Sequence, residues 1–522
     1  MADRASDEPS ASAAAYPRWI LLEYSEGCGD PDAKTVAHAR TSKGRPIIVS
    51  FVLAAPPAVS RLRLHSPGLP DRVHMRSLVI AAHGDSVLVN IETTSYRGER
   101  KDVFASDYFI YCAGDAATKP SLPPSLSLLP PCYLTKQEER KPKATRYMPY
   151  EGTAILRRGH DDVLVAALDS VLNKKEKQSG PVEIELCLLR SGDWEVMRLP
   201  VIHDEGKTKE VSCWWTDGVI PVGDRFLLWV DYYRGIIYSD VWQQIPELRY
   251  VSLPVEPNPF RMNNRGGSRY RSLCATAGGS LVRFVEVFSR CCCGYPLQFA
   301  TTCAVSHNAF TVTTWALQMD DMMTWDKVGV IDCDEIWSLP GYHGVVPRIK
   351  PEYLTVSLDD PDVICFVVNK NKYKKGVDGD LGTWLIELDT RRMELRSICN
   401  YDLEFYNWPH FTASSICEYF DASSRRHTLT RPKDTNLEAR ASPSKLTLPK
   451  VVSHEKMLGT LREIPNLARD DMLKAYAVLA SDESQFKFRS LLALPMDMRK
   501  YYCLVIEKLP CSVAQAGVVN GE

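Results

Sequence analysis

The sequence lacks the features of a secreted or membrane-spanning protein. Its opening stretch, MADRASDEPSASAAAYPRW, carries acids where a signal peptide has a basic cluster, and it contains no apolar core of the required length. Nowhere do about 18 apolar residues run together to cross a bilayer, and no Asn-x-Ser/Thr glycosylation acceptor occurs. We therefore expect a protein of the cytosol or nucleus that does not associate with membranes.

Local catalytic motifs are also missing. The sequence has no Gly-x-Ser-x-Gly, no phosphate-binding Gly-x-x-x-x-Gly-Lys and no Gly-x-Gly-x-x-Gly. The eleven histidines form no His-Glu-x-x-His pair, because His454-Glu455 has no second histidine. The sequence therefore predicts no catalytic residue and no cofactor, although an enzyme could still assemble its site from distant segments.

The net charge of the chain does not favour binding to a polyanion. The 522 residues carry 63 Lys and Arg against 65 Asp and Glu, a formal net charge of −2. Without an overall positive field, sequence-independent binding to nucleic acid or an anionic membrane is not expected. A nucleic-acid partner is therefore disfavoured, and only a local basic patch would provide one.

Metal-binding patterns are weak. Cys291-Cys292-Cys293 with Cys303 is the densest cysteine cluster, but adjacent residues of a strand point to opposite faces, and no Cys-x-x-Cys occurs. Three acidic clusters lack the loop spacing of known calcium sites: Asp320-Asp321, Asp332 to Glu335, and Asp359 to Asp362. We expect no metal site, solvated acidic turns, and sixteen cysteines as free thiols in a reducing compartment.

What the sequence has in abundance is short runs of β-branched and aromatic residues broken by Gly, Asp, Asn and Ser, a pattern typical of antiparallel strands. One element recurs at intervals of roughly 55 to 75 residues. In it, a polar turn leads to an alternating strand that ends at Leu-Pro or a similar stop. The copies are Ser125 to Pro130, Trp194 to Pro200, Leu248 to Pro254, Trp325 to Ile331 and Met393 to Ile398.

About two dozen candidate strands precede residue 400, enough for about six four-stranded blades. A ring of blades is favoured because it protects strand edges that an open sheet would expose. We therefore predict a mainly β chain with an antiparallel, β-propeller-like body over residues 17–415, and a pair of β-sandwiches as the alternative. The opening strand near Trp19 to Tyr24 is expected to pair with a late strand near Trp384 to Leu388 and close the ring.

The composition changes after the body. Residues 416–450 are predicted to form a disordered linker, since from Ser423 to Lys450 seven Lys or Arg face two acids and aromatics are absent. Residues 451–510 are predicted to form a small helical tail. In it, Leu473, Tyr476, Ala477 and Ala480 share one helix face, and further helices are expected at His454 to Glu463, Gln485 to Ala493 and from Pro495 to Ile506. Residues 1–16 and 511–522 are expected to be disordered.

One aromatic segment is the candidate binding surface. Trp214, Trp215, Asp231, Tyr232, Tyr233 and Arg234 combine the residue types that protein interfaces favour. A purely structural interpretation stays open, in which Trp229 and one residue of the Trp214-Trp215 pair are core. In that interpretation Tyr232 to Gly235 is a hairpin turn with Gly235 at positive φ.

Several segments resemble the plant family known as domain of unknown function 1618. They are PRWILLEYS, VSFVLAAPPAVSRLRLHSPG, SLVIAAHGDSVLV, ELCLLRSGDWEVMRLPV, WWTDGVIPVGDRFLLWVDYYRGIIYSDV, ELRYVSLPV, DEIWSLPGYHGVVPRIKP, and the tail LREIPNLARDDMLKAYAVLA with FRSLLALPMDMRKYYCLVIEK. The resemblance covers roughly Pro17 to Lys508 outside the linker. It implies a sheet-rich body similar to F-box-associated domains, but this sequence has no F-box-like segment before that body.

These observations favour a non-catalytic module that binds a protein partner. Two alternatives remain: a β-propeller enzyme acting on a small molecule or glycan, and a nuclear factor that binds nucleic acid through the basic linker. Catalytic side chains with shifted pKa values in a central channel would distinguish the enzyme. Steeply salt-dependent affinity would distinguish the nucleic-acid-binding factor.

Overall fold

In the computed structural model, the chain separates into two compact units, Met1–Arg431 and Pro432–Glu522. The structure describes residues 16–26, 30–70, 73–97, 100–118, 120–132, 146–159, 162–171, 182–190, 192–255, 269–276, 279, 281–290, 308–319, 323–370, 382–401, 411–420, 460–462, 464, 467–480 and 500.

The first unit is mainly β, and nearly all of its strands pair antiparallel, as the sequence predicts. The strands fall into six groups. Group 1 contains β25 (Phe411–Ser414), β1 (Ile20–Glu26), β4 (Val59–His65), β3 (Pro46–Val52) and β2 (Ala37–Arg40). Group 2 contains β5 (Val73–His83), β6 (Ser86–Arg97), β7 (Arg100–Cys112) and β8 (Ser125–Leu128). Group 3 contains β9 (Thr153–Arg158), β10 (Asp162–Val171), β11 (Glu183–Arg190) and β12 (Asp193–Ile202).

The other three groups follow in chain order. Group 4 contains β13 (Gly218–Val222), β14 (Phe226–Asp231), β15 (Gly235–Asp240) and β16 (Leu248–Ser252). Group 5 contains β17 (Arg271–Ala275), β18 (Val282–Ser289), β19 (Phe310–Leu317) and β20 (Trp325–Asp332). Group 6 contains β21 (Glu352–Val356), β22 (Val363–Asn369), β23 (Thr383–Asp389) and β24 (Glu394–Asn400).

Links between groups are short. Groups 1 and 2 form one nine-stranded sheet through a single residue pair, Ser25 with Leu78. Groups 3 and 4 form one eight-stranded sheet through two parallel pairs, Val201 with Leu248 and Ile202 with Arg249. Within group 1, β1 also pairs parallel with β4. The long ladders therefore lie within the groups.

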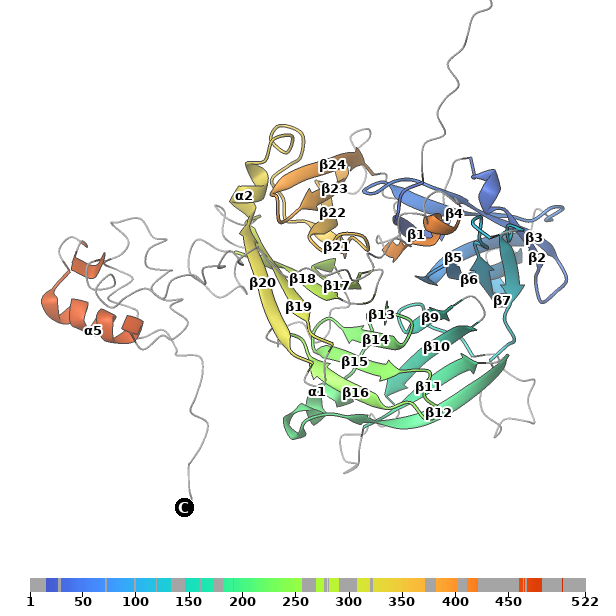
Figure 1. The fold of residues 1–522 in the computed structure, drawn as a ribbon, viewed down its shortest axis with the longest axis horizontal. Helices are drawn as coiled ribbons and strands as arrows, with labels where there is room; N and C mark the ends of the chain where they lie inside the picture. The colour runs from blue at the N-terminus through green and yellow to red at the C-terminus, as the bar shows by residue number, and fades with distance from the viewer. Residues whose placement is uncertain are drawn as a thin grey trace, which may run out of the picture. The chain divides into compact units, whose positions relative to one another are not determined.

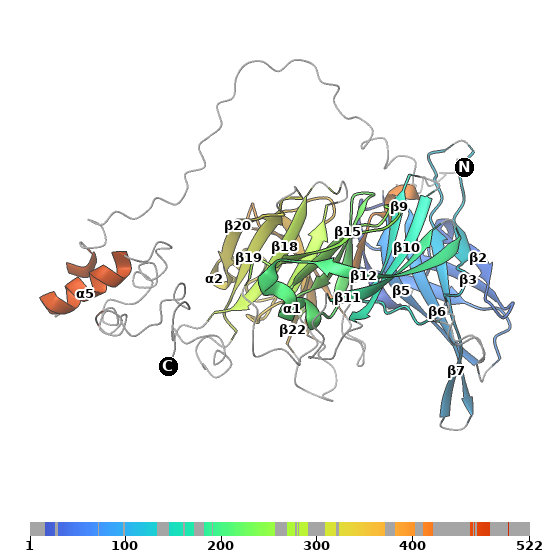
Figure 2. The same ribbon diagram turned by 90° about the horizontal axis from the view of Figure 1, so that it is seen from below.

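The first strands of successive groups contact one another around a closed circuit. β5 contacts β9, β9 contacts β13, β13 contacts β17, and β17 contacts β21. β21 contacts β25, and β25 contacts β5, which returns the circuit to its start. Figure 1 shows the sheets placed around a common centre with these strands innermost. Seen from below, the β6–β7 hairpin extends beyond the neighbouring strands (Figure 2).

A hydrophobic core lies between each pair of neighbouring groups. Trp229 and Leu186 belong to the core shared by groups 3 and 4, and Phe284 with Leu228 to the core shared by groups 4 and 5. Equivalent cores join groups 1 and 2, groups 2 and 3, groups 5 and 6, and groups 6 and 1. A strand inside a group is thus covered on both faces, which explains why β22, with the sequence VICFVVN, is almost continuously buried.

The recurring element of the sequence corresponds to the last strand of groups 2 to 6. Its five copies fall at β8, β12, β16, β20 and β24. These outer strands alternate or are largely exposed, as in β20, where only the first and last two residues are partly covered. The repeat found in the sequence therefore marks the outer edge of these five groups.

The closing strand differs from the prediction. β1 pairs with β25, with Ile20 opposite Ser414, and not with a strand near Trp384 to Leu388. Those residues form β23, which pairs with β22 and β24 inside group 6. The body also extends past residue 415, since Ile416, Cys417 and Phe420 are buried in the core of groups 1 and 2.

Helices are few in the described residues of the first unit: α1 (Thr208–Ser212), α2 (Cys333–Trp337) and the 3-10 turns Ala33–Thr35, Glu205–Lys207 and Ile416–Tyr419. The second unit contains α5 (Arg469–Ala480), where a helix was predicted. Among the α5 residues whose burial is described, Ala475 and Leu479 are buried, whereas Leu473, a member of the predicted apolar face, is 50% exposed, so that prediction is wrong for Leu473.

The other predicted tail helices lie almost wholly outside the described residues, as do most of the predicted linker and both predicted disordered ends. Among the described helices, none combines the length and apolar character needed to cross a membrane.

Candidate functional site

A cavity of about 940 Å³ lies where the first strands of the groups converge. Its wall includes residues from β5, β9, β13, β17, β21 and β25. Charged or titratable side chains in the wall come from different groups and include Arg18, His83, Arg157, Asp217, Asp224, Arg271, Asp359 and Glu418. Because these residues are far apart in the sequence, no local motif could have indicated the cavity.

The predicted binding segment lies partly in this wall and partly in the core. Trp214 is 5% exposed and packs edge-on against Tyr250, so it is the core member of the tryptophan pair, beside the fully buried Trp229. Trp215 is 46% exposed. Of the six predicted residues, Trp214, Asp231 and Tyr232 are buried and cannot contribute an exposed patch, whereas Trp215 can.

Asp231 organises the turn between β14 and β15. Its Oδ1 accepts the backbone N–H of Tyr233 at 2.9 Å, and its Oδ2 accepts that of Trp215 at 3.2 Å. The guanidinium of Arg234 lies 2.6 Å from the same Oδ2. Burial raises the pKa of Asp231, while Arg234 and the backbone donors oppose that shift. These contacts give Asp231, Tyr233 and Arg234 a shared role in holding the hairpin.

Gly235 closes this turn for a reason other than the one predicted. Its φ is not among the positive values of the described chain. Instead, a Cβ at this position would lie 2.4 Å from the Val251 carbonyl oxygen and 2.5 Å from the Tyr250 ring. Glycine is required because β15 and β16 approach closely here.

Asp217 is the titratable group that the sequence interpretation did not single out. It precedes β13 and lines the cavity, and its Oδ2 accepts the Tyr232 backbone N–H at 2.9 Å. Burial, reinforced by the nearby charge of Asp231, raises the pKa of Asp217 to about 7. The Tyr232 donor and Arg234 oppose that shift. The only signal for Asp217 in the sequence is its position close to the Trp214-Trp215 pair.

His83 bridges three groups at the cavity wall. Its Nδ1 accepts the backbone N–H of Arg157 at 2.9 Å, which joins β5 to β9. A hydrogen bond with the Gly223 backbone connects the ring to the turn after β13. Burial lowers the pKa of His83. The hydrogen bond with Gly223 and the negative charges of Asp224 and Asp85 oppose that shift. The neutral ring is the form that accepts the Arg157 N–H.

Every arginine of the wall has an acidic partner. Arg18 lies 3.2 Å from Asp359, and Arg157 lies 3.0 Å from Asp85. Arg271 lies 2.6 Å from Glu286 and also donates to the Tyr232 carbonyl oxygen at 2.5 Å. The wall therefore offers no uncompensated cation from these side chains.

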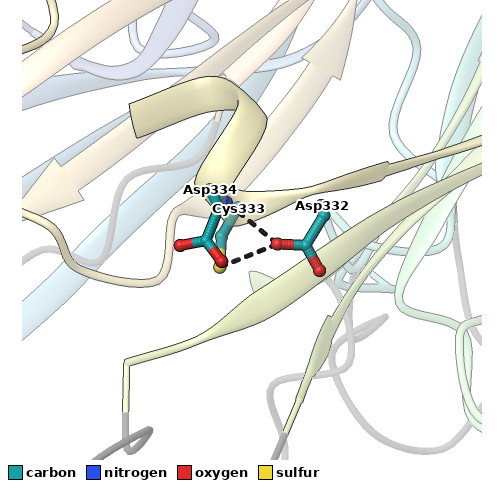
Figure 3. Close-up of side chains that lie close together, drawn as sticks. All are labelled: Asp332, Cys333 and Asp334. Atoms are coloured by element: carbon teal, nitrogen blue, oxygen red, sulfur yellow. Dashed lines mark hydrogen bonds between the residues drawn. The ribbon is translucent and has the colours of Figure 1, made fainter. Parts of the chain in front are cut away.

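A separate group of possible metal ligands lies on the outer edge of group 5. Asp332, Cys333 and Asp334 lie close together at the start of α2, as Figure 3 shows. Asp332 caps this helix, accepting the Asp334 backbone N–H at 2.9 Å. The Arg290 guanidinium reaches both carboxylates, at 2.9 Å from Asp332 and 3.0 Å from Asp334. This arginine occupies the position that a cation would need.

The remaining cluster predictions have separate outcomes. The acids between Asp359 and Asp362 form a turn and pair with arginines, for example Asp360 with Arg396 at 3.0 Å. Asp320-Asp321 and the cysteines at 291–293 and 303 lie outside the described residues. Nine cysteines are described, and all nine are free thiols.

Comparisons with known proteins add little about activity. No curated protein sequence matches this chain. Three solved structures are similar at low level. The WD40 domain of SCAP from fission yeast is 11% identical, with 71% of this chain and 78% of that chain covered and a TM-score of 0.27. A putative 6-phosphogluconolactonase from Bacteroides uniformis is 10% identical, with coverages of 72% and 85% and a TM-score of 0.27. Apo AztD from Citrobacter koseri is 8% identical, with coverages of 76% and 96% and a TM-score of 0.28.

The segment from β14 to β22 is the part of the chain that matches a known protein family. It contains the WVDYYRGIIYSDV and ELRYVSLPV motifs on which the family resemblance rests. A family model described as "Protein of unknown function (DUF1618)" matches this chain over residues 229–365.

Proposed function

We propose that the first unit is a six-bladed β-propeller in which each strand group is one blade. Three observations support this: the closed circuit of first-strand contacts, a core between every pair of neighbouring groups, and the pairing of β1 with β25. That last pair joins the two ends of the body in one sheet, which leaves no open innermost edge.

We further propose that this chain is a non-catalytic protein-interaction module of the cytosol or nucleus, whose partner binds at the central cavity. The observation that supports this proposal is a cavity of about 940 Å³ in which each lining arginine forms an ion pair with an acidic residue. Catalysis of group transfer usually relies on donors or cations aimed at developing negative charge. A wall with its cations neutralised suits recognition better than such chemistry.

Of the predicted binding residues, Trp215 is the exposed one, and it lies close in sequence to the cavity wall. It lies two residues before Asp217 in the wall and is 46% exposed, although its backbone is held by Asp231. Tryptophan is enriched among the residues that dominate binding energy at protein interfaces. A partner that inserts a segment into the cavity would therefore meet Trp215 beside Asp217.

The test blocks the cavity without disturbing the fold. Gly218 lines the cavity, and a Cβ added there has no neighbour within 4 Å. Gly218→Trp should therefore fill space in the cavity. Gly206→Trp is the matched control, because Gly206 is exposed, has equally open surroundings and does not line the cavity.

Tagged wild-type and variant proteins would be used to capture partners from the native tissue, followed by mass spectrometry. We expect a defined set of partners to be lost with Gly218→Trp, weakened with Trp215→Ala and retained with Gly206→Trp. An unchanged partner set with folded Gly218→Trp would refute binding at the cavity.

A further inference from the structure

The cavity wall at the start of β9 and β13 has an unusual balance of charge. Arg234 is a cation that acts on Asp217, and it forms an ion pair with Asp231. Arg271, in the same cavity wall, forms an ion pair with Glu286. Asp217 and Glu151 form no ion pair within 4 Å in the described structure. Glu151 acts on Asp217 as a further negative charge, and Asp231 does the same. The surroundings of Asp217, which itself lines the cavity, therefore carry an excess of negative charge.

A second feature in the same wall is an unsatisfied hydroxyl. Thr153 opens β9, which contacts β13, and it contributes to the cavity wall. It is 2% exposed, and its Oγ1 has no hydrogen-bond partner among the described residues. Buried polar groups normally have a partner, from protein, water or a ligand. A donor entering the cavity here could supply one.

We infer that this part of the cavity binds one lysine or arginine side chain of a partner protein, with Asp217 as the counter-ion. The inference rests on the proposed function and adds the chemistry of the inserted residue. Such a side chain brings only hydrogen-bond donors and one positive charge, which complements Asp217 and the oxygen of Thr153 in the cavity wall. Its apolar stem can contact the aliphatic wall residues Val219 and Ile220.

Binding of a cation at this position must be linked to release of a proton. With burial and Asp231 holding the pKa of Asp217 near 7, only about a tenth of the carboxyl is ionised at pH 6 and about nine-tenths at pH 8. Asp231, Arg234, Glu151 and Tyr232 face Asp217, and Arg271 lines the same cavity with its charge balanced by Glu286. A ligand that requires the ionised form should thus bind about tenfold more tightly at pH 8 than at pH 6.

The experiment uses the full-length protein and labelled Gly-Ser-Arg-Ser-Gly, with Gln and Glu in place of Arg as matched peptides. Calorimetry in two buffers of different ionisation heat gives both affinity and protons released. We expect binding of the Arg peptide, proton release near pH 7 and about tenfold tighter binding at pH 8 than at pH 6. Equal binding of the Arg and Gln peptides would overturn the inference.

Two variants locate the effect. Asp217→Asn keeps an acceptor for the Tyr232 N–H, so it should remain folded while losing both affinity at pH 8 and the pH dependence. Asp359→Asn removes another acid of the wall, one already paired with Arg18, and should leave the pH dependence intact. Retained pH dependence in Asp217→Asn would contradict the assigned counter-ion.

The outcomes also separate the two proposals and the two possible sources of the cation. If Gly218→Trp abolishes partner capture and Asp217→Asn does not, the proposed function stands and the counter-ion inference fails. If Gly218→Trp changes nothing, the proposed function itself fails. Butylamine and butylguanidinium are titrated as small-molecule controls. If either binds as tightly as the Arg peptide, the ligand is a small cation, and the inference that the cation belongs to a partner protein is wrong.

Discussion

Tyr401 donates a hydrogen bond of 2.6 Å from its hydroxyl to Oε1 of Glu23, joining residues 378 positions apart in the chain. Glu23 lies on β1 and also forms an ion pair with Arg61 on β4 at 2.6 Å. Tyr401 is 4% exposed and packs edge-on against Phe411 at the start of β25. This contact therefore reinforces the junction at which the last group meets the first.

Removing that hydroxyl should loosen the junction. Tyr401→Phe keeps the ring contact and removes the donor from a partly buried carboxylate oxygen. We expect a loss of about 1.5 kcal/mol in the free energy of unfolding, as for hydrogen bonds to charged groups. Denaturant unfolding measures it, with Tyr147→Phe as control, because Tyr147 is 58% exposed. Equal stability of the two variants would show that the contact does not support the junction.

The turn between β14 and β15, which ends at Gly235, provides a sharper steric test. Gly235→Ala would place a Cβ 2.4 Å from a backbone carbonyl oxygen, which cannot move away as a flexible side chain would. We expect a destabilisation of about 3 kcal/mol, at the upper end of overpacking effects. Gly329→Ala, in the exposed strand β20 with nothing within 4 Å, should cost well under half of that. Thermal unfolding of both variants makes the comparison.

Asp217 should make the body less stable as the pH rises. Its pKa is raised from 3.8 to about 7 in the folded chain, so the folded state holds a proton that the unfolded state has already lost between these values. Stability contributed by the protonated form is therefore lost as the pH rises from about 4 to about 7. Asp217→Asn should be more stable than wild type at pH 8, by about 1–3 kcal/mol after allowance for partial solvation.

The comparison at two pH values isolates this effect. Near pH 4 the advantage of Asp217→Asn should largely vanish, because the wild-type carboxyl is then neutral. Asp193→Asn, at an exposed position at the start of β12, should change stability little at either pH. An Asp217→Asn variant no more stable than wild type at pH 8 would mean that this carboxyl is ionised without cost.

His83 should have the opposite effect on stability: its contribution should be lost as the pH falls below about 6.5. Burial lowers its pKa below 6.5, so the unfolded chain takes up a proton first as the pH falls. Stability is then lost below pH 6.5, as far as the folded-state pKa. Protonation would also remove the Nδ1 lone pair that accepts the Arg157 N–H. His83→Asn, which cannot titrate, should show a smaller loss of stability between pH 6.5 and 5 in chemical denaturation. An unchanged slope would assign that loss to other groups.

The outer strands were predictable from sequence because their signal is local. Each of β12, β16, β20 and β24 shows alternation after a polar turn, and the stop that follows is visible in a few residues. β25 was missed for the converse reason: its four residues, FTAS, carry no alternation, and their position depends on pairing with β1 almost 400 residues away.

The candidate site depends still more on distant contacts. Trp215 and Arg234 stood out by residue type, whereas Asp217 and His83 acquire their shifted pKa values only through burial by other groups. A sequence pattern reports what a residue can do, and the three-dimensional neighbours decide its protonation. The cavity itself is formed by strands from all six groups, so no single segment could have predicted it.

The helix of the second unit shows how periodicity can favour the wrong face. Leu473 with Ala477 and Ala475 with Leu479 are both spaced four residues apart, so both pairs satisfy helical spacing. In the structure Ala475 and Leu479 are fully buried, whereas Leu473 is 50% exposed. The larger side chain of the buried pair, Leu479, should therefore carry most of the packing energy of α5.

A matched pair of substitutions tests this. Leu479→Asp places a carboxylate where no solvent reaches and should cost about 3 kcal/mol or more in local stability, because an unpaired buried charge is strongly unfavourable. Leu473→Asp places the same group on the exposed face, where its cost should stay near the few tenths of a kcal/mol typical of surface changes. Hydrogen exchange of the α5 amides measures both. Protection should collapse in Leu479→Asp and persist in Leu473→Asp, while the strands of the first unit remain protected in each. A short amphipathic helix is marginal without its buried face, so comparable exchange in the two variants would mean that α5 is held by contacts other than Leu479.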